Sequence, residues 1–280
     1  MVTALFIIGW AAYSILMSIF ITPNYLIPVW VVSGPIVGFV FAMFITLILI
    51  YTVIVPTKVT NKFKAYYTKS LCWFATHFLQ GIRVTIHNKE YVKDLKQIIV
   101  YANHKSKADP QILLEVIKGP VGFTPKKNLY TAPFLGTYFK AIGCMCIDRT
   151  SDRETAKGLI KAIKDINSGM SMLVHPEGGI CTREVEIMAD QRPGAYKIAQ
   201  KTMAPIVPVA ILGSSKIHKY PALLYPKKVD VYILKPLLYE DYKDMSTIEI
   251  SQYVYDTVNK QVESINGVKP IPADTKYYHQ

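Results

Sequence analysis

The sequence predicts an α/β fold: a mostly parallel sheet flanked by helices, preceded by an N-terminal hydrophobic two-helix membrane hairpin. Three observations lead to this prediction. The N-terminal fifth of the chain is apolar and uncharged, the remainder contains short β-branched runs, and amphipathic helix-like stretches separate several of those runs. Strands that alternate with helices indicate a parallel sheet covered by helices.

The predicted hairpin comprises residues 1–57, which contain no Asp, Glu, Lys, Arg or His. Its two apolar runs are Val2–Ile21 and Val29–Val55. About 20 helical residues match a hydrocarbon core of roughly 30 Å, so either run is long enough to cross a bilayer. The polar, proline-bounded segment between them favours a tight connection. Residues 58–280 are then expected to form one catalytic domain.

Two other structures could explain the apolar start of the chain. A cleaved signal peptide would begin with a basic region, which is missing here, and a soluble buried helix pair would seldom lack charge altogether. Lysines directly after the second run place the following domain on the cytoplasmic face of the cell membrane, by the positive-inside tendency. These lysines are Lys58, Lys62, Lys64 and Lys69. Whether the hairpin spans the bilayer or enters one leaflet stays open.

The domain that follows is expected to contain alternating strands and helices. The strand-like runs are 83–87, 98–102, 121–124, 144–147, 171–174, 206–212 and 229–234. The clearest helix-like stretches are 110–118, 133–141, 153–167, 194–201 and 246–265. Within residues 153–167 the apolar side chains share one side, as in a surface helix.

The net charge of +12 lies wholly after residue 57. The basic residues are dispersed and no nucleic-acid-binding motif is visible, so nucleic acid is not an expected partner. Anionic headgroups and phosphorylated substrates explain the charge better, with ordinary solvated lysines as the alternative. The cysteines form no CxxC pair, and no His/Asp/Glu cluster has ligand spacing, so no metal site is expected.

A histidine and an aspartate stand out at the end of a predicted strand. His104 and Asp109 follow the apolar run 98–102 within the segment Asn-His-Lys-Ser-Lys-Ala-Asp. If the chain turns between them, the carboxylate binds one imidazole nitrogen and leaves the other free to accept a proton. The alternative is an ordinary structural hydrogen bond.

Three later segments contain polar residues or proline at strand ends. They are 143–149 (Gly-Cys-Met-Cys-Ile-Asp-Arg), 175–183 (His-Pro-Glu-Gly-Gly-Ile-Cys-Thr-Arg) and 206–211 (Ile-Val-Pro-Val-Ala-Ile). Each has a simpler explanation by itself: a surface ion pair, a turn, and an edge strand or bulge, respectively.

Together and in this order, the four segments resemble the motifs of the glycerolipid acyltransferase family. That family carries NHxxxxD, GxxxIDR, PEGTR and VPV blocks, and the chain is most similar to 1-acylglycerol-3-phosphate acyltransferases over about residues 83–212. The resemblance implies transfer of a fatty acyl group from acyl carrier protein or coenzyme A to lysophosphatidic acid at a lipid bilayer. It implies no cofactor beyond this acyl donor.

The resemblance also implies roles for individual residues. His104 would be the general base and Asp109 its partner. The residues expected to bind substrate are Arg149, Glu177, Gly178, Arg183, Lys127 and Arg192. The arginines would bind phosphate through paired donors. Glu177 would orient an arginine or bind a glycerol hydroxyl, and the N–H of Gly178 could stabilise the oxyanion.

The chain departs from the family pattern in the third block. Where Glu-Gly-Thr-Arg is usual, it has Glu-Gly-Gly-Ile-Cys-Thr-Arg at residues 177–183, so Arg183 is either the displaced family arginine or incidental. Ser106 is a weaker candidate for a nucleophile because no Gly-x-Ser-x-Gly elbow is present. Other open functions are acylation of glycerol 3-phosphate or another lysolipid, thioester hydrolysis, and non-catalytic binding of anionic lipid.

Overall fold

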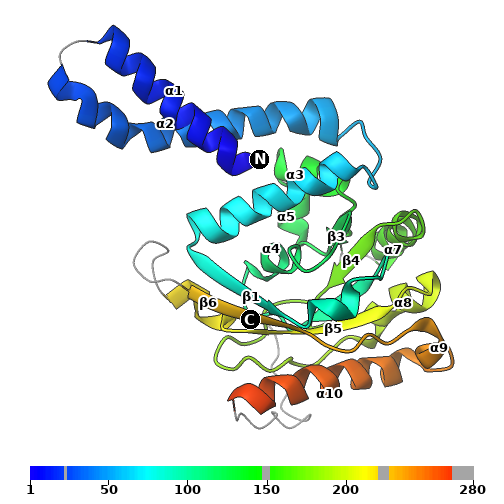
Figure 1. Cartoon of the computed structure of the whole chain (residues 1–280). Helices are drawn as coiled ribbons and strands as arrows, with labels where there is room; N and C mark the ends of the chain where they lie inside the picture. The colour runs from blue at the N-terminus through cyan, green and yellow to red at the C-terminus, as the bar shows by residue number, and fades with distance from the viewer. Residues whose placement is uncertain (22–23, 147–151, 220–226, 267–280) are drawn as a thin grey trace.

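The computed structural model describes residues 1–21, 24–146, 152–219 and 227–266 of the chain (Figure 1). Within these residues one sheet has the strand order β1-β6-β5-β2-β4-β3. All neighbouring strands are parallel except β5 and β6, which are antiparallel. The strands are β1 (Ile82–His87), β2 (Ile99–Ala102), β3 (Val121–Phe123), β4 (Ser171–Val174), β5 (Ile206–Leu212) and β6 (Lys227–Ile233). The predicted mostly parallel sheet is confirmed.

Helices cover both faces of the sheet (Figure 1). One face packs against a core formed with α7 (Asp152–Asn167), α8 (Lys197–Thr202), α9 (Tyr239–Tyr242) and α10 (Thr247–Asn266). The other face packs mainly against α4 (Asp109–Leu113) and the residues after it. Every residue of β2, β4 and β5 is buried. Burial on both faces explains why these strands are continuous apolar runs rather than alternating ones.

Two sequence-based expectations about strands need correction. Residues 144–146 of the expected strand 144–147 form no strand, and Ile147 lies outside the described residues. Met145 N–H donates a single ladder-like bond to the Phe123 carbonyl, and the segment turns after Gly143, whose φ is +82°. A single hydrogen bond at the sheet margin leaves an apolar run in a loop, although its composition is that of a strand.

Pro208 lies in a central strand, not in an edge strand. β5 pairs with β2 on one side and β6 on the other, and Pro208 is opposite Tyr101 of β2. The β6 side tolerates proline because the pairing there changes register: Val209 pairs with Ile233, while Ile206 pairs with Leu237. Residues 234–236 therefore lie opposite residues 207–208, so one strand has an extra residue. This is a β-bulge, which the sequence offered as the alternative to an edge strand.

The apolar N-terminus folds into two long helices that pack against each other. They are α1 (Val2–Phe20) and α2 (Ile27–Leu49), and α2 continues into a π-helical turn, η2 (Ile50–Ile54). Both α1 and the continuous helix 27–54 are long and apolar enough to cross a membrane. Figure 1 shows the pair extending away from the rest of the molecule.

A stripe of small residues lets the two helices approach closely. Gly34, Gly38, Ala42 and Thr46 recur every four residues and are the buried positions of α2. A Cβ added to Gly38 would lie 2.6 Å from the Phe6 carbonyl oxygen. Small residues at this spacing are typical of apolar helices that associate by backbone proximity.

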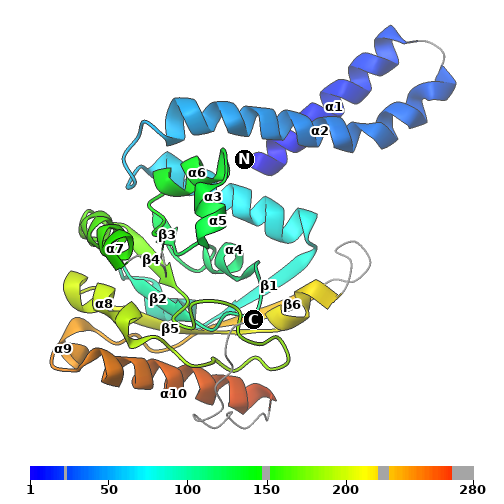
Figure 2. The same ribbon diagram turned by 180° about the vertical axis from the view of Figure 1, so that it is seen from behind.

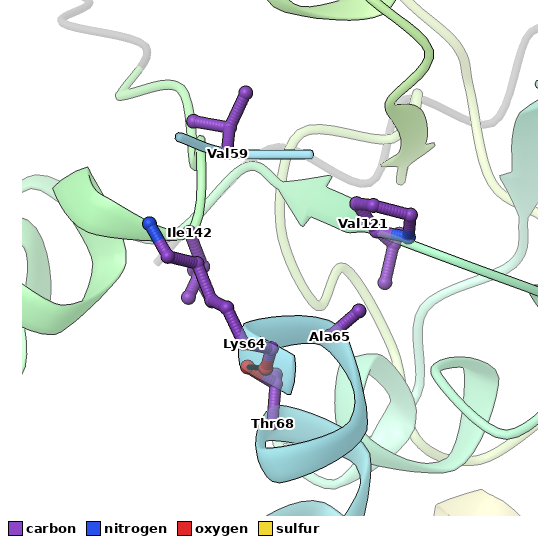
Figure 3. Close-up of a pocket in the computed structure, with 7 residues that line it drawn as sticks. Val59, Lys64, Ala65, Thr68, Val121 and Ile142 are labelled. Carbon is purple, nitrogen blue, oxygen red and sulfur yellow. Dashed lines mark hydrogen bonds between the residues drawn. The ribbon is translucent and has the colours of Figure 1, made fainter. Parts of the chain in front are cut away.

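The hairpin is fixed to the body at its base, through α3 (Lys62–Trp73) and α6 (Leu135–Ala141). The Thr46 and Tyr67 hydroxyls are 2.5 Å apart, and the buried Lys64 ammonium donates to the carbonyls of Thr57 and Ala141. Burial lowers the pKa of Lys64. Figure 3 shows Lys64 in a small pocket between α3 and the segment around Val121 and Ile142. This lysine anchors the chain after the hairpin.

Substitution of Gly38 tests the close packing of the hairpin. We expect Gly38→Ile to lower the stability of the full chain in detergent by about 1–3 kcal/mol, because the side chain has no space against Phe6. Val32→Ile is the matched control, since Val32 is 78% exposed. Thermal unfolding compares the two variants, and equal midpoints would contradict the packing described here.

Candidate active site

The candidate site lies where strands β2 and β4 end. The two strands are parallel neighbours, with Tyr101 opposite Val174, so the segments that follow them leave the same edge of the sheet. One segment carries His104 and the other carries His175 and Glu177. The carboxyl edge of a parallel sheet is the usual place for a functional site in α/β folds.

Asp109 organises the turn that contains His104. Its Oδ2 lies 3.0 Å from His104 Nδ1 and accepts hydrogen bonds from the backbone N–H groups of Lys105 (2.7 Å) and Ser106 (2.8 Å). Asp109 is fully buried, whereas the His104 side chain keeps 15% of its exposure. With Asp109 ionised, Nδ1 carries the imidazole proton and Nε2 has the free lone pair. The predicted pair therefore has the geometry of a general base and its orienting carboxylate.

Glu177 is bound to the same turn from the neighbouring strand. Its Oε1 accepts the His104 backbone N–H at 2.7 Å, and its Oε2 lies 3.3 Å from the Lys105 ammonium. The Lys105 and Glu177 side chains are fully buried. A buried ion pair of this kind stabilises a geometry rather than the whole fold, because desolvation offsets much of its attraction. The carboxylate therefore holds the backbone of His104 in place.

His175 stacks on the imidazole of His104. The ring centroids are 4.1 Å apart at an interplanar angle of 16°. His175 Nδ1 lies 3.0 Å from the Ala102 carbonyl oxygen, while its Nε2 is buried with no hydrogen-bond partner within the described residues. Burial, followed by the neighbouring His104, lowers the pKa of His175 to about 3. His175 is therefore a neutral ring that covers one face of His104.

Asn103 and Glu186 connect the end of β2 to β5 and to the loop after β5 through hydrogen bonds. The buried Asn103 amide donates to the carbonyls of Glu186 and Ile211 and accepts from the Ile211 N–H, which fixes the end of β2 against β5. Glu186 accepts from Gly213 N–H and from the Ser215 hydroxyl at 2.6 Å. Burial raises the pKa of Glu186. These contacts make the strand ends rigid.

The structure places the other candidate residues as follows. Gly178 follows Glu177 with φ of +74°, and its N–H donates to the His175 carbonyl at 3.0 Å, so an oxyanion would share that donor. Arg192 is exposed, and its backbone N–H donates to the Pro176 carbonyl. Arg183 is half-buried, and its Nε has no hydrogen-bond partner within the described part of the chain.

Of the two remaining candidates, Lys127 lies outside this cluster and Arg149 lies outside the described residues. Lys127 is exposed at the start of α5 (Lys127–Thr131), which follows β3. The Ser106 hydroxyl accepts the Ala108 N–H, within the turn, and is buried. No group of three or more His, Cys, Asp or Glu side chains in the described residues could hold a metal ion.

Sequence reasoning missed three residues that define the geometry: Asn103, Lys105 and His175. Lys105 and His175 both lie within the quoted motif segments, but the sequence assigns neither of them a role. The available signal was their position after two apolar strand-like runs, since parallel neighbours bring such residues together. Which runs were neighbours could not be read from one chain.

Comparisons with known proteins find acyltransferases. A model of the acyltransferase family matches residues 83–212. A probable 1-acyl-sn-glycerol-3-phosphate acyltransferase of Mycoplasma pneumoniae is 33% identical over 49% of this chain and 52% of its own length. A 1-acyl-sn-glycerol-3-phosphate acyltransferase of Saccharomyces cerevisiae is 27% identical over 79% of this chain and 74% of its own.

One solved structure has the same fold along nearly the whole chain. It is the 1-acyl-sn-glycerophosphate (LPA) acyltransferase PlsC from Thermotoga maritima, with a TM-score of 0.59, 18% identity, and coverage of 96% of this chain and 94% of its own. The chain spans about half the length of the two Mycoplasma relatives that it matches.

The buried pair of Lys105 and Glu177 can be tested by stability. We expect Lys105→Met to destabilise the protein by about 3–5 kcal/mol, because it leaves the Glu177 carboxylate buried without its cation. Lys161→Met is the control: it breaks a pair with Asp165 in which the lysine is 51% exposed, and should cost about 0.5 kcal/mol or less. Urea unfolding in detergent measures both, and equal losses would contradict the buried pair.

The neutral state of His175 has a consequence for acid stability. Because its folded pKa of about 3 is below the ordinary 6.5, the unfolded chain binds a proton that the folded chain does not. Its stabilising contribution is complete above about pH 6.5 and is lost as the pH falls toward 3. We expect His175→Phe, which keeps a stacking ring, to lose up to about 2–3 kcal/mol less between pH 7 and pH 4.5 in urea titrations. Parallel losses in both proteins would exclude this role.

Proposed function

We propose that this chain is a 1-acylglycerol-3-phosphate O-acyltransferase, because a model of the acyltransferase family matches residues 83–212. It would transfer a fatty acyl group from a thioester to the sn-2 hydroxyl of lysophosphatidic acid and form phosphatidic acid. The observation that carries the proposal is the His104–Asp109 pair, since Asp109 is fully buried while the His104 side chain remains partly exposed.

The proposed reaction needs a base and no protein nucleophile. His104 Nε2 removes the proton of the lipid hydroxyl as its oxygen attacks the thioester carbonyl carbon. The tetrahedral intermediate then collapses, the C–S bond breaks, and the imidazolium returns its proton to the leaving thiolate. The products are an ester and a free thiol. Asp109 stabilises the imidazolium while it exists.

The chain offers several donors for the phosphate of the acceptor. Arg183 supports this role because its buried Nε has no hydrogen-bond partner within the described residues, and a bound phosphate would supply one. Arg192 is joined to the site loop through its bond to Pro176. Arg149 and Lys127 stay candidates from the sequence. Glu177 would act by holding the His104 backbone and Lys105, because both of its oxygens are already engaged there.

We also propose that the hairpin places the enzyme on the membrane that holds its lipid substrates. Two apolar helices of sufficient length, joined to a domain that begins with lysines, support this location and a catalytic domain on the cytoplasmic face. Acyl carrier protein and acyl coenzyme A are both acidic, and both fit the basic domain as donors.

Loss of the base tests the proposed activity. We expect His104→Ala to reduce acyl transfer to lysophosphatidic acid by about 10²–10⁴-fold in bilayer-reconstituted protein, because the hydroxyl loses its proton acceptor. The measurement is thiol release from acyl coenzyme A and from acyl carrier protein, with and without lysophosphatidic acid. The control is His87→Ala, a histidine at the end of the edge strand β1, which should keep near-full activity.

The same measurement separates the alternatives. Thiol release that does not depend on lysophosphatidic acid would identify a hydrolase, and release with glycerol 3-phosphate or another lysolipid would identify a different acceptor. Near-full transfer by His104→Ala would exclude the mechanism. Lipid binding without any thiol release would leave a non-catalytic lipid-binding module.

A further inference from the structure

A second apolar surface lies at the base of the hairpin, at the corner between α5 and α6. We call it the corner patch: the exposed side chains of Leu129 (47%), Phe134 (55%) and Leu135 (41%), together with Tyr51 (51%) of η2. Phe134 and Tyr51 are in edge-to-face contact, with ring centroids 6.4 Å apart. Figure 2 shows α6 directly beside the α2 helix. The corner patch therefore continues the apolar surface of the hairpin onto the catalytic domain.

The backbone at this corner is strained at Phe134, whose side chain is exposed. Its φ is +58° and ψ is −55°, and the Leu135 N–H donates to the Pro133 carbonyl at 2.6 Å. This is a three-residue turn with positive φ, which is rare and strained, and a bulky aromatic residue is unusual there. The turn is also tight, because a Cβ on Gly136 would lie 2.2 Å from the Tyr130 carbonyl oxygen. Such strain at an exposed aromatic residue indicates a function for the exposure.

The charge around the corner patch is one-sided. Residues 1–89 and 116–147, which include the hairpin, α3, α5 and α6, contain no Asp or Glu. Lysines at Lys126, Lys127 and Lys140 flank the patch and are exposed. Asp165 of α7 is near this corner, since it acts on Tyr130, but it is paired with Lys161. Apolar side chains at a tip, flanked by exposed lysines, match an anionic lipid surface: the lysines reach the headgroups and the aromatic residue enters the interfacial zone.

The corner patch emerges from the edge of the sheet that carries His104. β3 is parallel to β4, which is parallel to β2, so all three strands end at the same edge. α5 begins four residues after the end of β3. An element bound to the bilayer here would hold the site edge toward the membrane, which the hairpin alone does not specify.

We propose that the corner patch is a second membrane contact, which binds anionic lipid headgroups and orients the carboxyl edge of the sheet toward the bilayer. The inference rests on the proposed membrane location of the hairpin. It does not depend on the acyl acceptor or on the chemistry at His104.

Hydrogen–deuterium exchange of the full chain tests this contact. The protein is compared in detergent, in nanodiscs of phosphatidylcholine, and in nanodiscs that also contain phosphatidylglycerol. We expect amides of residues 127–141 to gain protection in nanodiscs, most strongly with phosphatidylglycerol. We expect the double variant Lys126→Glu/Lys140→Glu to lose the phosphatidylglycerol-dependent part. The control is Lys197→Glu/Lys201→Glu on α8, which packs on the same face of the sheet as α10. This variant should keep the phosphatidylglycerol-dependent protection.

Phe134→Asn separates membrane contact from folding. Asparagine tolerates positive φ better than phenylalanine, so the variant should keep its thermal midpoint in detergent or raise it, yet lose protection of residues 127–141 in nanodiscs. Unchanged protection in this variant would overturn the inference. So would equal exchange of residues 127–141 in detergent and nanodiscs while the hairpin amides are protected. If the hairpin amides are also unprotected in nanodiscs, both the corner-patch contact and the proposed membrane location are wrong. The activity of His104→Ala tests the proposed chemistry separately, so the two failures can be distinguished.

Discussion

The geometry of the site depends on one buried carboxylate. Asp109 places a single oxygen against the His104 imidazole and two backbone N–H groups of the intervening turn. The buried oxygen thereby satisfies three donors of the turn at once. The orientation of His104, the direction of its free nitrogen and the start of α4 all follow from this contact.

The neighbouring strand adds a second constraint from the opposite side. Glu177 holds the His104 backbone and the buried Lys105, and the neutral His175 ring covers one face of the imidazole. His104 is thus fixed at its ring nitrogen, its main chain and its face, while its side chain keeps some exposure. Positional precision of this kind is what a general base requires, since a small displacement costs much of the rate.

The hairpin and α3, at the N-terminal end of the chain, are packed in a different way. Close helix packing through Gly34 and Gly38 makes the apolar hairpin a rigid unit, and Lys64 and Tyr67 fix its base to the domain. The hairpin, α3, α5 and α6 contain no Asp or Glu, and this composition favours the proposed contact with an anionic bilayer. In the proposed function, packing and charge in this part would both position the domain relative to lipid.

The sequence by itself determined the uncharged hairpin, most strands of the sheet, and the His104–Asp109 pair, because these depend on local composition and short spacing. It could not determine that 144–146 forms a loop or that Pro208 lies in a central strand, since both depend on which strands pair. The buried Lys105–Glu177 pair and the stack of His175 on His104 join residues about 70 positions apart. Only the tertiary structure decides such contacts, because the parallel pairing of β2 with β4, and no local preference of the chain, brings them together.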